Sequence, residues 1–196
     1  MPSLVRIGAI AAVLGGAAWA IKSASIILGG GQPQYLLEIG PVLFGVGLLG
    51  LHARLPRDDS ITRVGGVLAY LSGSLAAIAL VISASAGDRV TPATFSPTIL
   101  GAFVTGLAAL GVLGFAARRN QLLPAQLRWL PLAMGIAGIP MMLLGSVLSA
   151  IGEVLVEFPL LVLGVAWIFL GLAVWAETLG PEQTAEVAES GERVAL

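Results

Sequence analysis

Four stretches of this sequence, each 19 to 28 residues long, contain no Asp, Glu, Lys, Arg or His side chain. A helix rises about 1.5 Å per residue, so about 20 apolar residues cross the ~30 Å hydrocarbon core of a bilayer. Two further stretches, 4–28 and 35–51, are interrupted only by Arg6 and Lys22 in the first and by Glu38 in the second. The pattern therefore predicts an all-α integral membrane protein, a bundle of six transmembrane helices. The four uncharged stretches are 64–86, 90–117, 129–152 and 158–176.

The composition supports this fold class. Charged residues make up only 11% of the chain, compared with about 25% in water-soluble domains. This excludes a disordered chain, a nucleic-acid-binding protein and an ordinary cytosolic enzyme. A transmembrane barrel is excluded because its strands alternate apolar and polar residues, and these stretches do not. We predict one transmembrane domain over residues 1–176, with helices at 4–28, 35–53, 63–86, 97–117, 128–151 and 155–176.

The basic residues predict the orientation of the bundle. Six arginines, at positions 54, 57, 63, 118, 119 and 128, fall in the turns after the second and fourth helices, whereas the opposite turns hold only Lys22 and Arg89. By the positive-inside rule, the arginine-rich turns and both termini are expected to be cytoplasmic. The first helix begins like a signal peptide, but its apolar character continues to Leu28, which favours a retained helix. Scarce lysine and abundant alanine, glycine and arginine suit a GC-rich genome, so we expect a bacterial plasma membrane.

The end of the chain differs from the rest. Residues 177–196 contain five glutamates and one arginine, a net charge of −4, and Gly180-Pro181 interrupts any continuing helix. We predict a solvated, mobile cytoplasmic tail; a docking segment for a partner is the alternative.

Glycine and arginine recur at matching positions along the chain. An arginine precedes a glycine by ten residues in each odd-numbered helix: Arg6/Gly16, Arg63/Gly73 and Arg128/Gly138. The second and fourth helices share Gly-x-x-Gly-x-x-x-Arg, ending at Arg54 and Arg118. These matches predict three tandem helical hairpins. The alternative is chance, because the chain contains 26 glycines.

Glycine spacing also bears on helix packing. Seven-residue spacing is common, as in Gly8/Gly15, Gly66/Gly73 and Gly164/Gly171, whereas no two glycines are four residues apart. Residues seven apart share a helix face, and small residues there allow close left-handed crossings. We therefore expect glycine faces to point into the bundle. The same faces suit contact with a second copy or a larger membrane complex, so the expected partners are the lipid bilayer and another membrane subunit, and not nucleic acid.

The usual catalytic and cofactor motifs are absent. The sequence has no HExxH, no Gly-x-Ser-x-Gly, no Walker loop and no cysteine. His52 is the only histidine, and one imidazole does not assemble a metal or haem site. The Asp58-Asp59 pair is flanked by arginines, and we expect Asp59 or Ser60 to cap the third helix. The sequence thus indicates no catalytic residue, no metal site and no cofactor.

Polar residues gather near the predicted outer ends of the helices. Lys22 and Glu38 belong to one hairpin at similar depth, so they are expected to pair. Glu153 and Glu157 are four apart and share a face if the sixth helix begins early enough. Trp19 lies one turn before Lys22, so we expect its ring to form an apolar or cation–π wall beside Lys22. These residues, with the nearby serines, form either a structural polar cluster or an outward-facing ligand pocket, whose candidate members are Trp19, Lys22, Ser23, Glu38, Ser85, Ser146, Glu153 and Glu157.

Three functional hypotheses follow. The first is a non-catalytic membrane subunit or a protein that binds a lipid or small ligand, favoured by the missing catalytic motifs and short loops. The second is a small transporter or channel that uses the outer polar pocket. The third is an intramembrane enzyme with Glu153 or Glu157 as general base, which is not favoured because the sequence offers no nucleophile or metal site.

Overall fold

The computed structural model describes residues 2–33, 35–86 and 93–178, without the side chains of residues 2, 146, 149, 150 and 153. These residues form six α-helices and no strand. The acidic segment predicted as a tail lies outside the described residues from 179 onward, as does Arg89. The helices are α1 (Pro2–Ile27), α2 (Leu36–His52), α3 (Ser60–Ala86), α4 (Phe95–Arg119), α5 (Leu130–Ile151) and α6 (Glu153–Ala176).

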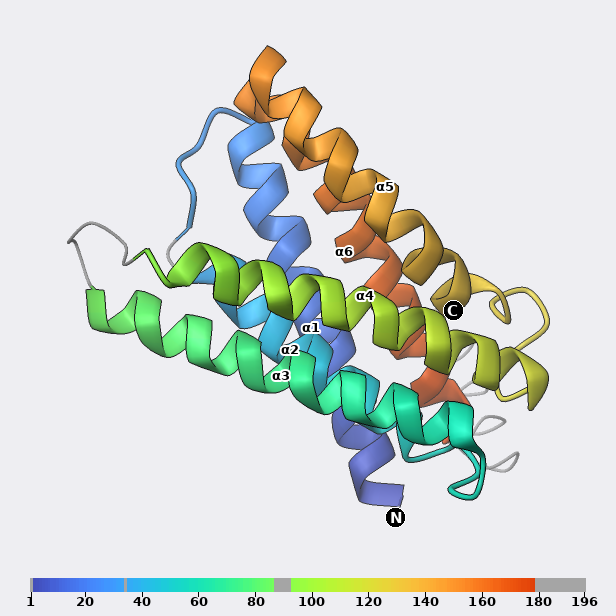
Figure 1. The fold of residues 1–196 in the computed structure, drawn as a ribbon. Helices are drawn as coiled ribbons and strands as arrows, with labels where there is room; N and C mark the ends of the chain where they lie inside the picture. Colours follow the sequence, from blue (N-terminus) through green and yellow to red (C-terminus); the bar gives the residue numbers. More distant parts are fainter. Residues whose placement is uncertain (1, 34, 87–92, 179–196) are drawn as a thin grey trace, which may run out of the picture.

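The helices pack as a closed ring. Each helix contacts the next along the chain, α6 returns to pack against α1, and α2 also contacts α4 (Figure 1). The α3/α4 pair and the α5/α6 pair converge where the chain turns from α4 to α5 and diverge toward the opposite end (Figure 1). We call the first of these the arginine end, because it carries the loops with Arg54, Arg57, Arg63, Arg118, Arg119 and Arg128. The opposite end is called the open end.

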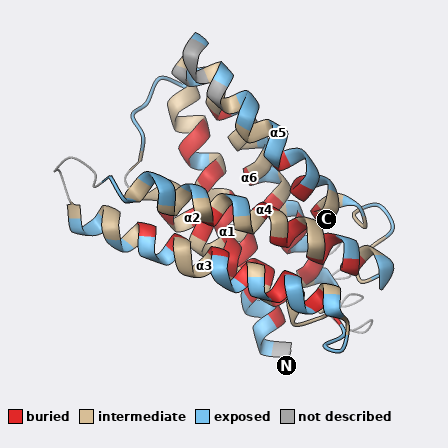
Figure 2. Ribbon diagram, viewed as in Figure 1, coloured by how far each residue is buried: buried red, intermediate tan, exposed pale blue. Residues whose placement is uncertain are grey.

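The surface of the bundle is typical of a protein surrounded by lipid. Four helical segments are long and apolar enough to cross a membrane: Ser3–Ile27, Ser60–Ala86, Phe95–Arg119 and Val154–Ala176. Buried residues concentrate between the helices, and the outer faces are exposed (Figure 2). Many of these exposed side chains are large and apolar, among them Ile7, Val67, Ile78, Leu143 and Val162. Apolar patches this extensive mark contact with a membrane or with other proteins, which supports a helical membrane bundle.

The helix boundaries differ by a few residues from the predicted ones. The third helix begins at Ser60 rather than at 63, because a carboxylate oxygen of Asp59 accepts a hydrogen bond from the Ile61 amide at 3.3 Å. The predicted capping role of Asp59 is therefore confirmed. The sixth helix begins at Glu153 rather than at 155, and Gly152 alone separates it from α5.

Glycines allow several helix pairs to approach closely. A methyl group at Gly8 would lie 2.5 Å from the Cα of Gly50, and one at Gly45 would lie 2.5 Å from the Cα of Gly73. On the other side of α1, a methyl group at Gly16 would lie 2.5 Å from the carbonyl oxygen of Gly164 in α6. The expectation that glycine faces point into the bundle is confirmed at these positions. Contact with another subunit stays a prediction and would have to use other surfaces.

Aromatic rings fill the centre between the close helix contacts. The Phe44 ring stacks on Trp167 with centroids 4.4 Å apart and planes 10° apart. Trp19 packs edge-on against Phe44, with centroids 5.2 Å apart, and at a tilt of 51° against Phe103, with centroids 5.1 Å apart. These rings join α1, α2, α4 and α6, so the core extends across the ring of helices.

Candidate functional site

A buried ion pair lies between α1 and α6, nearer the open end. The Lys22 ammonium donates to both carboxylate oxygens of Glu157, at 2.7 and 2.9 Å. Both side chains are more than nine-tenths buried. The expected pairing of Lys22 with Glu38 was wrong. Lys22 lies on the face of α1 that meets α6, and the return of α6 onto α1 supplies a nearer carboxylate.

Glu38 has a different partner. Its Oε1 accepts a hydrogen bond from the Ser83 hydroxyl at 2.8 Å, which links α2 to α3. Its Oε2 is buried and has no hydrogen-bond partner among the described residues. The polar residues near the open end therefore form two separate pairs, one between α1 and α6 and one between α2 and α3.

The positions of Lys22, Glu38 and Glu157 within their helices match the sign of each charge. Glu38 occupies the first turn of α2, and Glu157 lies about one turn inside α6, so both carboxylates are close to helix N-termini. Lys22 lies in the penultimate turn of α1, near the C-terminus of that helix. The helix dipole favours anions at N-termini and cations at C-termini. The dipole of its own helix therefore partly stabilises each charge, in addition to the stabilisation by its side-chain partner.

An apolar cavity of about 340 Å³ lies next to the Lys22–Glu157 pair, between α1, α4, α5 and α6. Glu157 is flanked on α6 by the lining residues Val156 and Pro159, and Lys22 is one turn beyond Trp19, which also lines the cavity. The other lining residues are Phe103, Leu107, Gly138, Met141, Met142, Gly145, Leu160 and Leu163. The cavity lining is therefore apolar, and the ion pair neighbours it along α1 and α6 without lining it.

Trp19 provides the wall that the sequence predicts, in its apolar form. The indole is buried, and its Nε1 donates to the Leu37 carbonyl at 3.3 Å, so its only polar group is satisfied. Gly40 lies directly under this ring and leaves room for it. The ring is thereby held in one orientation against the cavity.

The remaining predicted residues divide into two groups. Ser23 is fully buried, and its hydroxyl has no described partner, whereas Ser85 is exposed and donates to Val81 of its own helix at 2.7 Å. The side chains of Ser146 and Glu153 lie outside the description. Among the described residues, no group of three His, Asp or Glu side chains is placed to hold a metal ion.

Sequence reasoning missed the cavity itself. Its walls include Phe103, Met141, Met142 and Leu160, which are indistinguishable in sequence from lipid-facing residues. The one available signal was the glycine pair Gly138 and Gly145 on one face of α5, because missing side chains leave space between helices. In comparisons with known proteins, no family model matches the chain, and no curated protein or solved structure matches it either.

Proposed function

We propose that this chain is a non-catalytic membrane protein that binds a lipid-like molecule in the cavity beside Lys22 and Glu157. The observation that carries the proposal is the juxtaposition of an apolar cavity with a buried ion pair. A molecule with an apolar chain and a polar end matches this arrangement, because the chain fills the apolar cavity and the polar end lies toward the neighbouring ion pair.

The size and lining of the cavity support such a ligand. A volume of about 340 Å³ lies at the lower end of the range for small-molecule sites, roughly 300–1,000 Å³. Met141 and Met142 contribute flexible, polarisable side chains to its wall, and methionines adapt to apolar ligands of varied shape. A substrate that needs several fixed hydrogen bonds would find few partners here.

The placement in the membrane is part of the proposal. All six helices cross the bilayer, with both termini and the arginine end on the cytoplasmic side of a bacterial plasma membrane. The excess of arginine in the turns of that end supports this orientation. The recurring glycines and arginines support an origin from three tandem hairpins.

Photo-crosslinking tests the ligand site. The purified protein is reconstituted with a phospholipid that carries a diazirine near the end of one acyl chain, irradiated, and digested for mass spectrometry. Crosslinks are expected on Met141, Met142 and Leu160. Gly145→Leu should abolish them, since a methyl group at Gly145 only reaches Val156 at 3.8 Å and a leucine extends into the cavity.

Ala137→Leu is the matched control. Ala137 is on the same helix and is exposed, so a leucine there enlarges an outer face and not the cavity. Crosslinking of the cavity residues should persist in this variant. Equal crosslinking in both variants, or crosslinks spread evenly over all outer faces, would contradict the proposal.

A small transporter is the second candidate function, and Glu38 favours it. An intramembrane carboxylate is costly unless it is used or neutralised, and Oε2 of Glu38 has no partner among the described residues. Proteoliposomes loaded with a pH-sensitive dye, and others loaded with Na⁺ or K⁺ indicators, test this function. Flux that is lost in Glu38→Ala and Lys22→Ala samples that are still folded supports transport; the same flux in both variants and in the unaltered protein contradicts it.

A further inference from the structure

A second, larger cavity lies at the arginine end, on the side opposite to the ion pair along the bundle. Its volume is about 540 Å³, and it lies between the start of α1, the end of α2 and the start of α3. Three of its lining residues, Arg57, Arg63 and His52, carry basic side chains, and none is acidic. The others are Leu4, Ala53, Gly66, Val67 and Tyr70.

The lining changes in polarity along α3. Arg63 is at the beginning of this helix, Val67 is one turn further, and Tyr70 is about 10 Å from Arg63 along the axis. Val67 and Tyr70 are both exposed, at 68% and 69%. The cavity therefore has a cationic end near the tip of the bundle and an apolar end deeper along it. This gradient matches the boundary between lipid headgroups and acyl chains.

A hydrogen bond positions Arg63 at the cationic end. The Nε of Arg63 donates to the backbone carbonyl of Arg57 at 3.0 Å, which fixes the base of the guanidinium. Within the described residues, no bond engages the two terminal nitrogens of Arg63. A guanidinium presents these nitrogens in a planar fork that matches phosphate oxygens.

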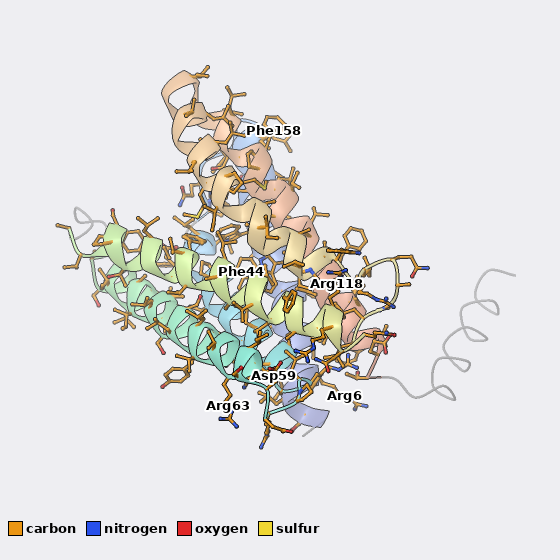
Figure 3. All side chains as sticks on the ribbon, turned by 45° about the vertical axis from the view of Figure 1, so that its right-hand side comes forward. Arg6, Phe44, Asp59, Arg63, Arg118 and Phe158 are labelled. Carbon is orange, nitrogen blue, oxygen red and sulfur yellow. The ribbon has the colours of Figure 1, made fainter. Side chains whose placement is uncertain are left out.

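The carboxylate of Asp59, one of two acidic residues in this turn, is engaged elsewhere. Asp59 directs its carboxylate to the start of α3, where it accepts from the Ile61 amide at 3.3 Å and from the Thr62 hydroxyl at 3.4 Å. It does not line the cavity. Figure 3 shows Arg63 and Asp59 at the same end of the bundle as Arg6, far from Phe158.

Glycine opens the cavity on its inner side. Gly66 faces the imidazole of His52, and a methyl group at this position would lie 2.6 Å from the ring. The absence of a side chain lets the histidine lie against α3 instead of being displaced outward. The His52 ring and the α3 backbone at Gly66 therefore lie against each other in the cavity lining.

From this arrangement we propose that the cavity binds the headgroup of an anionic phospholipid, with the phosphate held by Arg57 and Arg63 and the upper acyl chain along Val67 and Tyr70. The occupant is a lipid of the surrounding bilayer and not a free phosphate compound, because three of the eight lining residues, Leu4, Val67 and Tyr70, are apolar or aromatic and exposed. This site is separate from the cavity beside Lys22 and does not depend on the function proposed for it.

Native mass spectrometry tests the site. The full-length protein, in a detergent that retains bound lipid, is titrated with phosphatidylglycerol, with phosphatidylcholine and, in a third arm, with glycerol 3-phosphate. Phosphatidylglycerol should bind more tightly than phosphatidylcholine. Arg63→Gln should weaken the binding of phosphatidylglycerol about five-fold, the factor that corresponds to about 1 kcal/mol per basic residue near a lipid surface. Phosphatidylcholine binding should change little.

Two further variants keep the result interpretable. Arg57→Gln should weaken phosphatidylglycerol binding by a similar factor and leaves the Arg57 carbonyl, which anchors Arg63, in place. Arg119→Gln removes the same charge from the exposed end of α4, outside the cavity, and should have no such effect. Equal weakening by all three variants would show a diffuse charge effect and overturn the site. Binding of glycerol 3-phosphate as tight as that of phosphatidylglycerol would overturn the lipid as its occupant.

Discussion

The ammonium of Lys22 and the carboxylate of Glu157 are 135 residues apart in the chain and 2.7 Å apart in the structure. They join the first helix to the last, and both are buried. The pair therefore stabilises the contact between α1 and α6, which closes the ring of six helices.

Removing one partner of this pair should destabilise the protein strongly. Lys22→Ala leaves the Glu157 carboxylate buried without a cation, a change that costs about 3–5 kcal/mol in comparable pairs. Glu157→Ala should have a similar effect. The double variant Lys22→Met/Glu157→Leu should recover most of the loss, because no charge then remains buried. Thermal unfolding in detergent measures all three, and losses that simply add in the double variant would contradict the coupling.

The hydrogen bond from Ser83 to Glu38 gives a second prediction. Ser83→Ala leaves a buried carboxylate without its described donor, which should lower stability by about 1–3 kcal/mol. Ser85→Ala is the matched control, because the Ser85 hydroxyl is exposed and bonds only to a carbonyl of its own helix. Its effect should stay within about 0.5 kcal/mol. Equal unfolding temperatures for the two variants would show that the bond is energetically unimportant.

Glycine contacts should respond differently to the same substitution. Gly8→Ala places a methyl group 2.5 Å from the backbone of Gly50, so α1 and α2 must separate. Overpacking of this kind costs about 1–3 kcal/mol. Gly145→Ala meets only Val156 at 3.8 Å and should be neutral or stabilising by up to about 1 kcal/mol, since alanine favours helix. Denaturation with dodecyl sulfate compares the two; a similar loss for both would refute the assigned packing.

The proposed orientation can be tested directly because the chain contains no cysteine. Asp58→Cys places a single thiol in the turn between α2 and α3, and Gly31→Cys places one in the turn between α1 and α2; both positions are exposed. A membrane-impermeant maleimide added to intact cells should label only the second. Labelling of Asp58→Cys under these conditions would reverse the orientation.

The sequence alone was sufficient for the helical class and for the position of each helix within a few residues. Long runs without charge, such as 64–86, have few alternatives in lipid, because a helix satisfies all of its own backbone hydrogen bonds. Asp59 as a cap and glycine at close helix contacts were also predictable. Each depends on interactions within a few residues or on the space that a missing side chain leaves.

The partners of the polar residues were decided only by the tertiary structure. Chain order predicted that Lys22 would meet Glu38 in the adjacent helix, yet α1 has two neighbours, and Lys22 faces the one that is farthest along the chain. The two cavities depend on the same kind of information. The first lies between four helices and the second between three, and the angles at which helices diverge arise from packing over the whole bundle, which no local pattern of residues encodes.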